Sequence, residues 1–282
     1  MTGFSAEWLA LREPADHRAR DQALQNNICE QLAILARTEH RTVRLIDLGC
    51  GSGSNLRALA LRMPEQQHWT LVDYDPLLLT AARAALAAWA DHVISNDAKL
   101  TIRKATKTIE IEFAQVDLAQ DIERVLAWPA DLITAAAFFD LVAEPWLIRF
   151  CQALRVPLYT VLTYDGVEQW LPAHTADVSI LKAFHAHQKT DKGFGVAAGP
   201  DAAAIMQREL AARGFQVMLA PSPWQIDQTE AAFMQALATG SAAAVRETGL
   251  LTHQEIDEWL AARLTAQHCT VGHWDILATP AR

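Results

Sequence analysis

Three glycines alternate with other residues in the segment LIDLGCGSGSN, which follows a strand-like apolar run and precedes a helix-like one. Asp47 ends the apolar run, and Gly49, Gly51 and Gly53 follow it. Glycine permits a tight turn and a close approach of the backbone to a ligand, and a helix that begins after such a turn presents unpaired N–H groups. Three alternating glycines exceed what an ordinary turn needs, so the spacing predicts a ligand-binding loop.

The spacing of these glycines also separates the classes of ligand. A dinucleotide-binding loop has the pattern G-x-G-x-x-G, but its third position falls on Ser54 when counted from Gly49 and on Leu56 when counted from Gly51. A phosphate-binding P-loop needs a lysine, and the run contains none. The pattern therefore argues against a nicotinamide-dependent oxidoreductase and against a P-loop protein.

Acidic residues end two further strand-like runs. Asp73, in LVDYDP, lies 20 residues after Gly53, where an acid can accept hydrogen bonds from both hydroxyls of a ribose. Asp75 precedes Pro76 and is interpreted as a helix cap with proline at the first helical position. Asp117, in AQVDLAQ, is a candidate ligand residue and also a candidate cap for a helix that begins at residue 119; the two roles can coexist.

Together, D-x-G-x-G-x-G (47–53), LVDYDP and AQVDLAQ resemble the first three motifs of the class I S-adenosylmethionine (SAM)-dependent methyltransferases. The motifs cover about residues 40–165. The resemblance implies SAM as methyl donor and S-adenosylhomocysteine as product. It also implies the following cofactor contacts: Asp47, Gly49, Gly51 and Gly53 beside the amino acid part and ribose, Asp73 on the ribose, Tyr74 against the adenine, and Asp117 with the N–H of Leu118 on the adenine edge.

The segment after the fourth predicted strand departs from one branch of this family. Enzymes of the family that methylate amino groups of DNA bases or glutamine side chains carry [DN]-P-P-[YFW] here, whereas this chain has Ala136, Ala137, Phe138 and Phe139. The two phenylalanines are either core residues or aromatic neighbours of the sulfonium.

Strand-like runs alternate with helix-like ones along the chain. Strands are expected at 43–48, 69–73, 109–117, 131–137, 157–163, 215–220 and 270–279, and helices at 15–37 (with Asp16 as a possible cap), 54–63, 76–90, 119–127 and 144–154. Capping-box spacing marks helix starts at Asp227 with Glu230 and at Thr252 with Glu255. The predicted fold class is α/β: a Rossmann-like, seven-stranded, mostly parallel sheet with helices on both faces, an antiparallel last strand and helical cap insertions.

We expect one methyltransferase domain over residues 1–282. Its parts are an N-terminal helical region (1–40), a SAM-binding core (41–165) and cap insertions on the substrate side (166–200 and 221–268). In an open α/β sheet the ligand crevice lies outside the carboxyl ends of the parallel strands. Insertions there would enclose a small pocket, which suits a small-molecule methyl acceptor.

The segment after the fifth predicted strand holds the candidate catalytic groups. His185 or His187 could remove a proton from the acceptor, and Asp165 could bind an acceptor amine. Residues i and i+2 do not share a helix face, so one histidine at most is expected to face the site. Asp140, Asp165 and a histidine are an alternative set of metal ligands, but the Asp-Asn pair of the metal-dependent catechol-type enzymes is absent, so no metal is expected.

Several other residues of the cap segments have two interpretations. Tyr164, Asp191 and Lys192 add polar groups beside glycines that could hinge a lid. Tryptophans 170, 224 and 259 either stack on a flat acceptor or belong to the core.

Composition excludes some partners. The formal net charge of −9 opposes binding to polynucleotides, and the basic segment 99–107 is expected to be an exposed strand or hairpin. The four cysteines are widely spaced, which predicts neither a zinc site nor disulfides. No apolar run reaches the roughly 20 residues that span a bilayer, and the N-terminal residues lack a signal-peptide pattern, so no membrane partner and a cytoplasmic location are expected.

The most favoured function is therefore methyl transfer from SAM to an oxygen or nitrogen of a small metabolite. Two alternatives stay open: a non-catalytic SAM-binding regulator, and a methyltransferase that acts on protein or RNA. The sequence names neither the acceptor atom nor the oligomeric state.

Overall fold

A computed structural model describes residues 4–96, 98–191 and 193–281. Its central sheet has the strand order β3-β4-β5-β2-β1-β6-β7-β10-β8, and β9 pairs with β10 beside this path. The strands are β1 (Val43–Leu48), β2 (Gln66–Asp73), β3 (His92–Asn96), β4 (Leu100–Lys104), β5 (Lys107–Gln115), β6 (Leu132–Ala136), β7 (Leu158–Leu171), β8 (Phe215–Pro221), β9 (Trp224–Asp227) and β10 (His268–Pro280).

The sheet confirms the predicted fold class. Strands β5, β2, β1, β6 and β7 are parallel, and β10 is antiparallel to both of its neighbours, β7 and β8. These seven strands are the ones that the sequence predicts. The hairpin of β3 and β4 extends one edge, and its β4 lies inside the basic segment that was expected to form an exposed strand.

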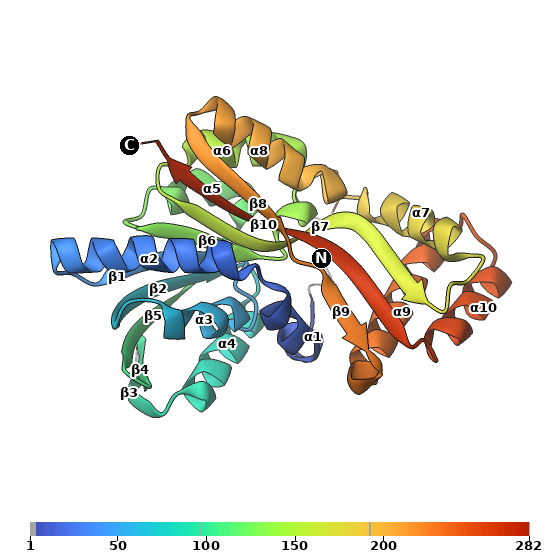
Figure 1. Cartoon of the computed structure of the whole chain (residues 1–282), viewed down its shortest axis with the longest axis horizontal. Helices are drawn as coiled ribbons and strands as arrows, with labels where there is room; N and C mark the ends of the chain where they lie inside the picture. The colour runs from blue at the N-terminus through green and yellow to red at the C-terminus, as the bar shows by residue number, and fades with distance from the viewer. Residues whose placement is uncertain (1–3, 97, 192, 282) are drawn as a thin grey trace.

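Helices cover both faces of the sheet (Figure 1). The longer helices are α1 (Ala6–Ala19), α2 (Gln22–Glu39), α4 (Pro76–Trp89), α5 (Leu118–Leu126), α6 (Glu144–Ala153), α7 (Asp177–Gln188), α8 (Ala202–Ala212), α9 (Ala231–Thr248) and α10 (His253–Arg263), and α3 (Ser54–Leu59) is short. Alternation along β1 sends Val43 and Leu45 to the core under α2, α3 and α4, and Ile46 and Leu48 to the core under α5, α6 and α8. Among the described residues, no helix is both long and apolar enough to cross a bilayer.

The predicted helix over 15–37 is wrong in one respect, because two helices occupy this region. Asp16 lies inside α1, where its carboxylate accepts a hydrogen bond from Trp224 Nε1 at 3.0 Å. The cap of α2 is Asp21, whose carboxylate accepts from the N–H of Leu24 at 2.8 Å. Asp16 and Asp21 both precede helix-like runs in the sequence. Only the contact of Asp16 with the distant Trp224 shows that Asp21, and not Asp16, caps a helix.

β7 and β10 run beyond the sheet into a lobe that also contains β9, α7, α9 and α10 (Figure 1). β7 was predicted to end at 163 but continues to Leu171, which pairs with His268 of β10. Trp170, Trp224 and Trp259 lie in this lobe and are at most 5 % exposed, which supports the core interpretation of these tryptophans. The core of the lobe is thus continuous with the core on one face of the sheet.

Three of the five predicted caps are confirmed. Asp75 and Asp117 cap α4 and α5, and Thr252 with Glu255 forms a capping box on α10. The pair Asp227 and Glu230 does not form one, because the carboxylate of Asp227 accepts from Thr229 while that of Glu230 binds Arg18. A cation from α1 therefore replaces the local partner of Glu230.

We expect Thr252→Ala to lower the free energy of unfolding by about 1 kcal/mol, the usual contribution of an N-cap hydroxyl. The Thr252 hydroxyl accepts from the N–H of Glu255, and Glu255 accepts from the N–H of Thr252. Urea unfolding would measure the change. The control is Thr265→Ala, which removes an exposed hydroxyl that caps no helix start and is expected to change stability by less than about 0.5 kcal/mol.

Candidate functional site

The glycine loop joins β1 to α3 and needs glycine for steric reasons. Gly49, Gly51 and Gly53 have φ values of 63°, 52° and 77°, in the left-handed region that other residues rarely adopt. A Cβ atom at Gly49 would lie 2.7 Å from the Phe138 ring, and one at Gly51 would lie 2.9 Å from Leu9 of α1. The loop is therefore packed between the segment after β6 and the N-terminal helix.

Asp73, at the end of β2, is joined directly to this loop. Its carboxylate accepts hydrogen bonds from the N–H of Gly51 at 2.9 Å and from the N–H of Asp75 at 3.0 Å. Burial raises the pKa of Asp73, and the two N–H donors oppose that rise. The loop and the acid, separated in sequence, thus form one polar edge.

Asp47 lies below the loop, fully buried. Its Oδ1 accepts from Asn55 Nδ2 at 2.7 Å, and Asn55 in turn accepts from Arg20 at 2.8 Å. Asp47 Oδ2 has no hydrogen-bond partner in the described part of the chain. Burial raises the pKa of Asp47 to about 7, with the Asn55 hydrogen bond and the Arg20 charge opposing.

A small cavity of about 40 Å³ lies between the glycine loop and α1. Its charged lining is one guanidinium, Arg12, and two carboxylates, Asp16 and Asp47. Arg12 Nε is 3.2 Å from Asp16 Oδ2. Within residues 4–96, 98–191 and 193–281, the buried atoms Arg12 Nε and Ser52 Oγ have no hydrogen-bond partner. A cavity lined by a guanidinium and by carboxylates, with buried polar atoms that lack hydrogen-bond partners, suits a zwitterionic ligand such as an amino acid.

Helix α1 is held over the loop by three polar contacts. Arg57 Nε is 2.8 Å from Glu13, His17 Nε2 is 3.0 Å from the Ser54 hydroxyl, and Arg20 binds Asn55. Since Leu9 fills the space above Gly51, a ligand larger than this cavity requires α1 to shift outward.

The ends of β2 and β5 continue the same edge of the sheet. Tyr74 is 57 % exposed, and its carbonyl accepts from Gln115 at 3.2 Å. The carboxylate of Asp117 accepts from the N–H of Ala119 at 3.0 Å. The Leu118 side chain is buried, and its carbonyl accepts from Trp146 Nε1. All the residues assigned to SAM by resemblance thus lie at the carboxyl ends of β1, β2 and β5.

The structure separates the three candidate catalytic residues. His185 Nε2 is 3.0 Å from the hydroxyl of Tyr164, whereas His187 pairs with Glu247 of α9 at 2.9 Å. The carboxylate of Asp165 accepts from the N–H of Val167 and lies against Gly272. Burial lowers the pKa of His185 and raises that of Tyr164, so both side chains are neutral near pH 7.

Asp191, another of the polar candidates, binds within its own loop. The carboxylate of Asp191 accepts from the N–H groups of Gly193 and Gly195 and so fixes its own loop. Lys192 lies outside the described residues.

Sequence reasoning missed His273 of β10, and it named Asp16 only as a possible helix cap. His273 is 4 % exposed, its ring centroid is 4.6 Å from that of Trp224, and burial lowers its pKa to about 3. Asp16 bridges Arg12 and Trp224. No local signal marks His273, because a histidine in a strand is as common on the surface as in the interior.

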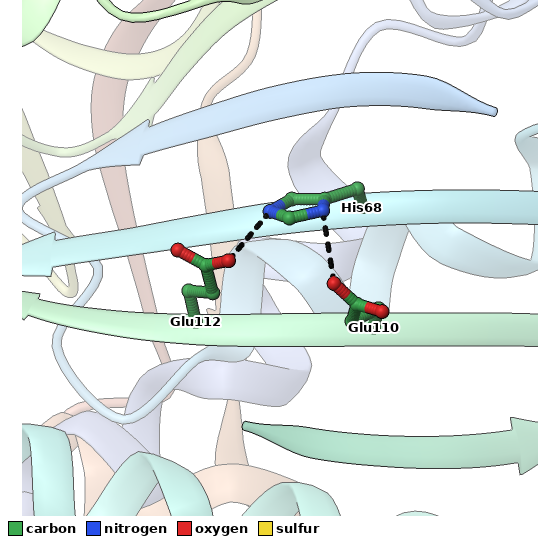
Figure 2. A group of neighbouring side chains, drawn as sticks. All are labelled: His68, Glu110 and Glu112. Carbon is green, nitrogen blue, oxygen red and sulfur yellow. Dashed lines mark ion pairs between the residues drawn. The ribbon is translucent and has the colours of Figure 1, made fainter. Parts of the chain in front are cut away.

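A separate group of ionisable side chains lies on β2 and β5 (Figure 2). His68 Nδ1 is 3.2 Å from Glu110, and His68 Nε2 is 3.5 Å from Glu112. Lys99 Nζ lies 2.7 Å from a carboxylate oxygen of each glutamate. Because the lysine already supplies the positive charge, these partly exposed residues are interpreted as an ion-pair network on the sheet surface.

We expect Asp47→Asn to stabilise the ligand-free protein at pH 8 by about 1 kcal/mol or more. The raised pKa means that, between pH 4 and 7, folded Asp47 holds a proton that the unfolded chain has lost, so this group destabilises the fold as pH rises. Asn cannot ionise and keeps the Asn55 contact. Urea unfolding at pH 4 and 8 tests this: the advantage of the variant should shrink at pH 4, and a variant weaker than wild type at pH 8 would contradict the assignment.

Comparison with known proteins gives structural resemblance only. No protein family profile and no curated protein matches the chain. The YcgJ protein of Bacillus subtilis is 11% identical, with 90% of this chain and 99% of that chain covered and a TM-score of 0.47. A cyclopropane-fatty-acyl-phospholipid synthase-like protein of Lactobacillus casei is 15% identical (98% and 94% covered, TM-score 0.47). A SAM-dependent methyltransferase of Thiobacillus denitrificans, in complex with S-adenosyl-L-homocysteine, is 16% identical (100% of both, TM-score 0.40).

The fold of the chain is Rossmann-like: five parallel strands lie in the order β5-β2-β1-β6-β7, followed by the antiparallel β10 and then β8.

Proposed function

We propose that this protein is a methyltransferase that transfers the methyl group of SAM to a small molecule. The observation that carries the proposal is the contact between Asp73 and the glycine loop. An acid at the end of β2 accepts from the N–H of Gly51, beside a loop in which three glycines have left-handed φ values. A carboxylate beside such a glycine turn supports a nucleoside ligand, whose ribose hydroxyls the acid would bind.

The order of strands supports an extended pose for SAM. The ends of β5, β2, β1 and β6 follow one another at about 4.8 Å per strand. Asp117 and Leu118 would hold the adenine, Asp73 the ribose, and the glycine loop the amino acid part. Tyr74, more than half exposed beside Asp73, would cover the adenine.

The cavity between α1 and the loop fits the amino acid end of SAM. Arg12 would bind the carboxylate, and Asp47, which has an unpartnered oxygen there, would bind the ammonium group. SAM supplies an electrophilic methyl group on a sulfonium. With the amino acid part at β1, that sulfonium falls near Ala136 at the end of β6, which also lines the cavity.

The lobe favours a small acceptor. The extensions of β7 and β10, with three helices, form the lobe beside the carboxyl end of β6 (Figure 1). There they would hinder the approach of a polymer. Tyr164 with His185 lies at the base of this lobe. In this proposal His185 and Asp165 stay candidates for contacting the acceptor, and His187, which pairs with Glu247, is assigned a structural role.

Transfer of isotope-labelled methyl from SAM into a cell extract tests this function. The extract is separated into small-molecule, protein and RNA fractions after the reaction. Label in the small-molecule fraction supports the proposal and gives a mass by which the product is identified. Label only in protein or RNA contradicts the small-molecule acceptor, and binding of SAM without any transfer indicates a non-catalytic regulator.

A further inference from the structure

Asp140 is a buried acid that the proposed function has not yet used. It lies in a single helical turn (Phe139–Leu141) directly after β6 and is 9 % exposed. Its Oδ1 has no hydrogen-bond partner in the described chain. The neighbouring rings of Phe138, Phe139 and Trp146 pack against one another and exclude water from this turn.

An ionisable acid in such a place opposes folding. Burial raises the pKa of Asp140 to about 6, opposed only in part by its own backbone, by the Arg12 charge and by the N–H of Tyr164. The charged and titratable groups that face it are Arg12 from α1 and Tyr164 from β7. An Asn would fill nearly the same volume without this cost.

The position of Asp140 relative to the proposed sulfonium site is informative. Ala136, four residues earlier, lines the cavity beside Gly49, and Phe138 packs on Gly49 itself. Arg12 lines the same cavity and acts electrostatically on Asp140. Asp140 follows β6, which lies between β1 and β7, and the N–H of Tyr164 on β7 donates to its carboxylate.

We propose that Asp140 is a catalytic residue that binds an amine of the methyl acceptor and takes its proton, so that the acceptor class is a small amine. The proposal rests on the proposed function. The amine binds as an ammonium ion, whose N–H donates to the unpartnered Oδ1 of Asp140. Its proton moves to that carboxylate, and the freed lone pair forms the new N–CH3 bond while the C–S bond breaks and its electron pair stays on sulfur.

The chemistry favours an amine over an alcohol. An alkyl ammonium such as that of lysine has a pKa of about 10.4, within a few units of the raised value for Asp140, whereas that of water, the simplest hydroxyl, is about 15.7. A carboxylate is thus far too weak a base for an unactivated alcohol.

The test compares wild type with Asp140→Asn and Asp140→Glu, and uses Asp121→Asn, an exposed acid on α5, as the matched control. S-adenosylhomocysteine binding is measured by calorimetry, and label transfer from SAM is measured with the small-molecule fraction of cell extract. Urea unfolding at pH 8 reports folding. We expect Asp140→Asn to fold and to bind S-adenosylhomocysteine within threefold of wild type but to transfer label at least 100-fold more slowly, with partial recovery in Asp140→Glu.

The pH profile distinguishes a catalytic acid from a structural one. Wild-type transfer should fall as pH drops through about 6, where Asp140 gains a proton, and Asp140→Asn should lack this decline. Equal transfer by wild type and Asp140→Asn, or a labelled product methylated on oxygen, would overturn the proposal. If wild type binds S-adenosylhomocysteine but transfers no label, the proposal also fails, whereas no binding at all would refute the proposed function itself.

Discussion

Replacing Asp73 with Asn is expected to weaken S-adenosylhomocysteine binding by tenfold to a hundredfold, which corresponds to about 1.4–2.8 kcal/mol. Asp73 is already oriented by the N–H groups of Gly51 and Asp75, which leaves its remaining lone pairs for the two ribose hydroxyls. Asn has one accepting oxygen, so its NH2 group must face one of these backbone donors. The variant therefore loses a charged acceptor and misplaces the glycine loop.

Calorimetric titration with S-adenosylhomocysteine would measure this effect. The chain offers a matched control two residues away: Asp75→Asn removes the same charge, but Asp75 caps α4 through the N–H of Leu77. We expect Asp75→Asn to lower the free energy of unfolding by about 1 kcal/mol or less while affinity changes less than threefold. Unchanged affinity in Asp73→Asn would refute the ribose assignment.

Substitution of Gly49 by Ala is expected to destabilise the protein by about 2–5 kcal/mol and to abolish measurable cofactor binding. Two costs add here. The left-handed φ of 63° costs about 1–2 kcal/mol for a residue with a Cβ atom. That atom would also lie 2.7 Å from the Phe138 ring, and relief of such an overlap costs about 1–3 kcal/mol.

Urea unfolding can separate the two costs. Gly214 has a φ of 84°, and no atom lies within 4 Å of a Cβ atom built there, so Gly214→Ala should show only the backbone cost. A double-mutant cycle of Gly49→Ala with Phe138→Ala should then recover the overlap as a coupling energy. Equal destabilisation by Gly49→Ala and Gly214→Ala would mean that the ring moves aside freely.

The two substitutions examine different halves of one arrangement. The Asp73→Asn substitution tests whether the polar edge binds a nucleoside. The Gly49→Ala substitution tests whether the loop must pack against the turn that carries Asp140. If both behave as expected, the donor site and the proposed acceptor site share the ring of Phe138 as a common wall. A change in that wall should then affect cofactor affinity and transfer together.

Local patterns in the sequence determine most of the core. The period of the apolar runs predicts the seven main strands, and short-range hydrogen bonds at Asp75, Asp117 and Thr252 define three helix starts as expected. The glycine loop and Asp73 are also recognisable, because their requirements are met within a few residues: a left-handed turn after one strand and an acid at the end of the next. The arrangement of these residues at this edge can therefore be predicted from their spacing.

Only the tertiary structure decides the rest, since those features depend on residues far apart in sequence. β7 continues to Leu171 because β10, about 100 residues later, pairs with it, and Asp16 is buried because Trp224 lies above it. Burial under distant elements lowers the pKa of His273 to about 3 and raises that of Asp140 to about 6. The proposed acceptor side of the site is assembled from α1, β7, β10 and the turn after β6, so its chemistry is set by burial and long-range contact, which no local pattern encodes.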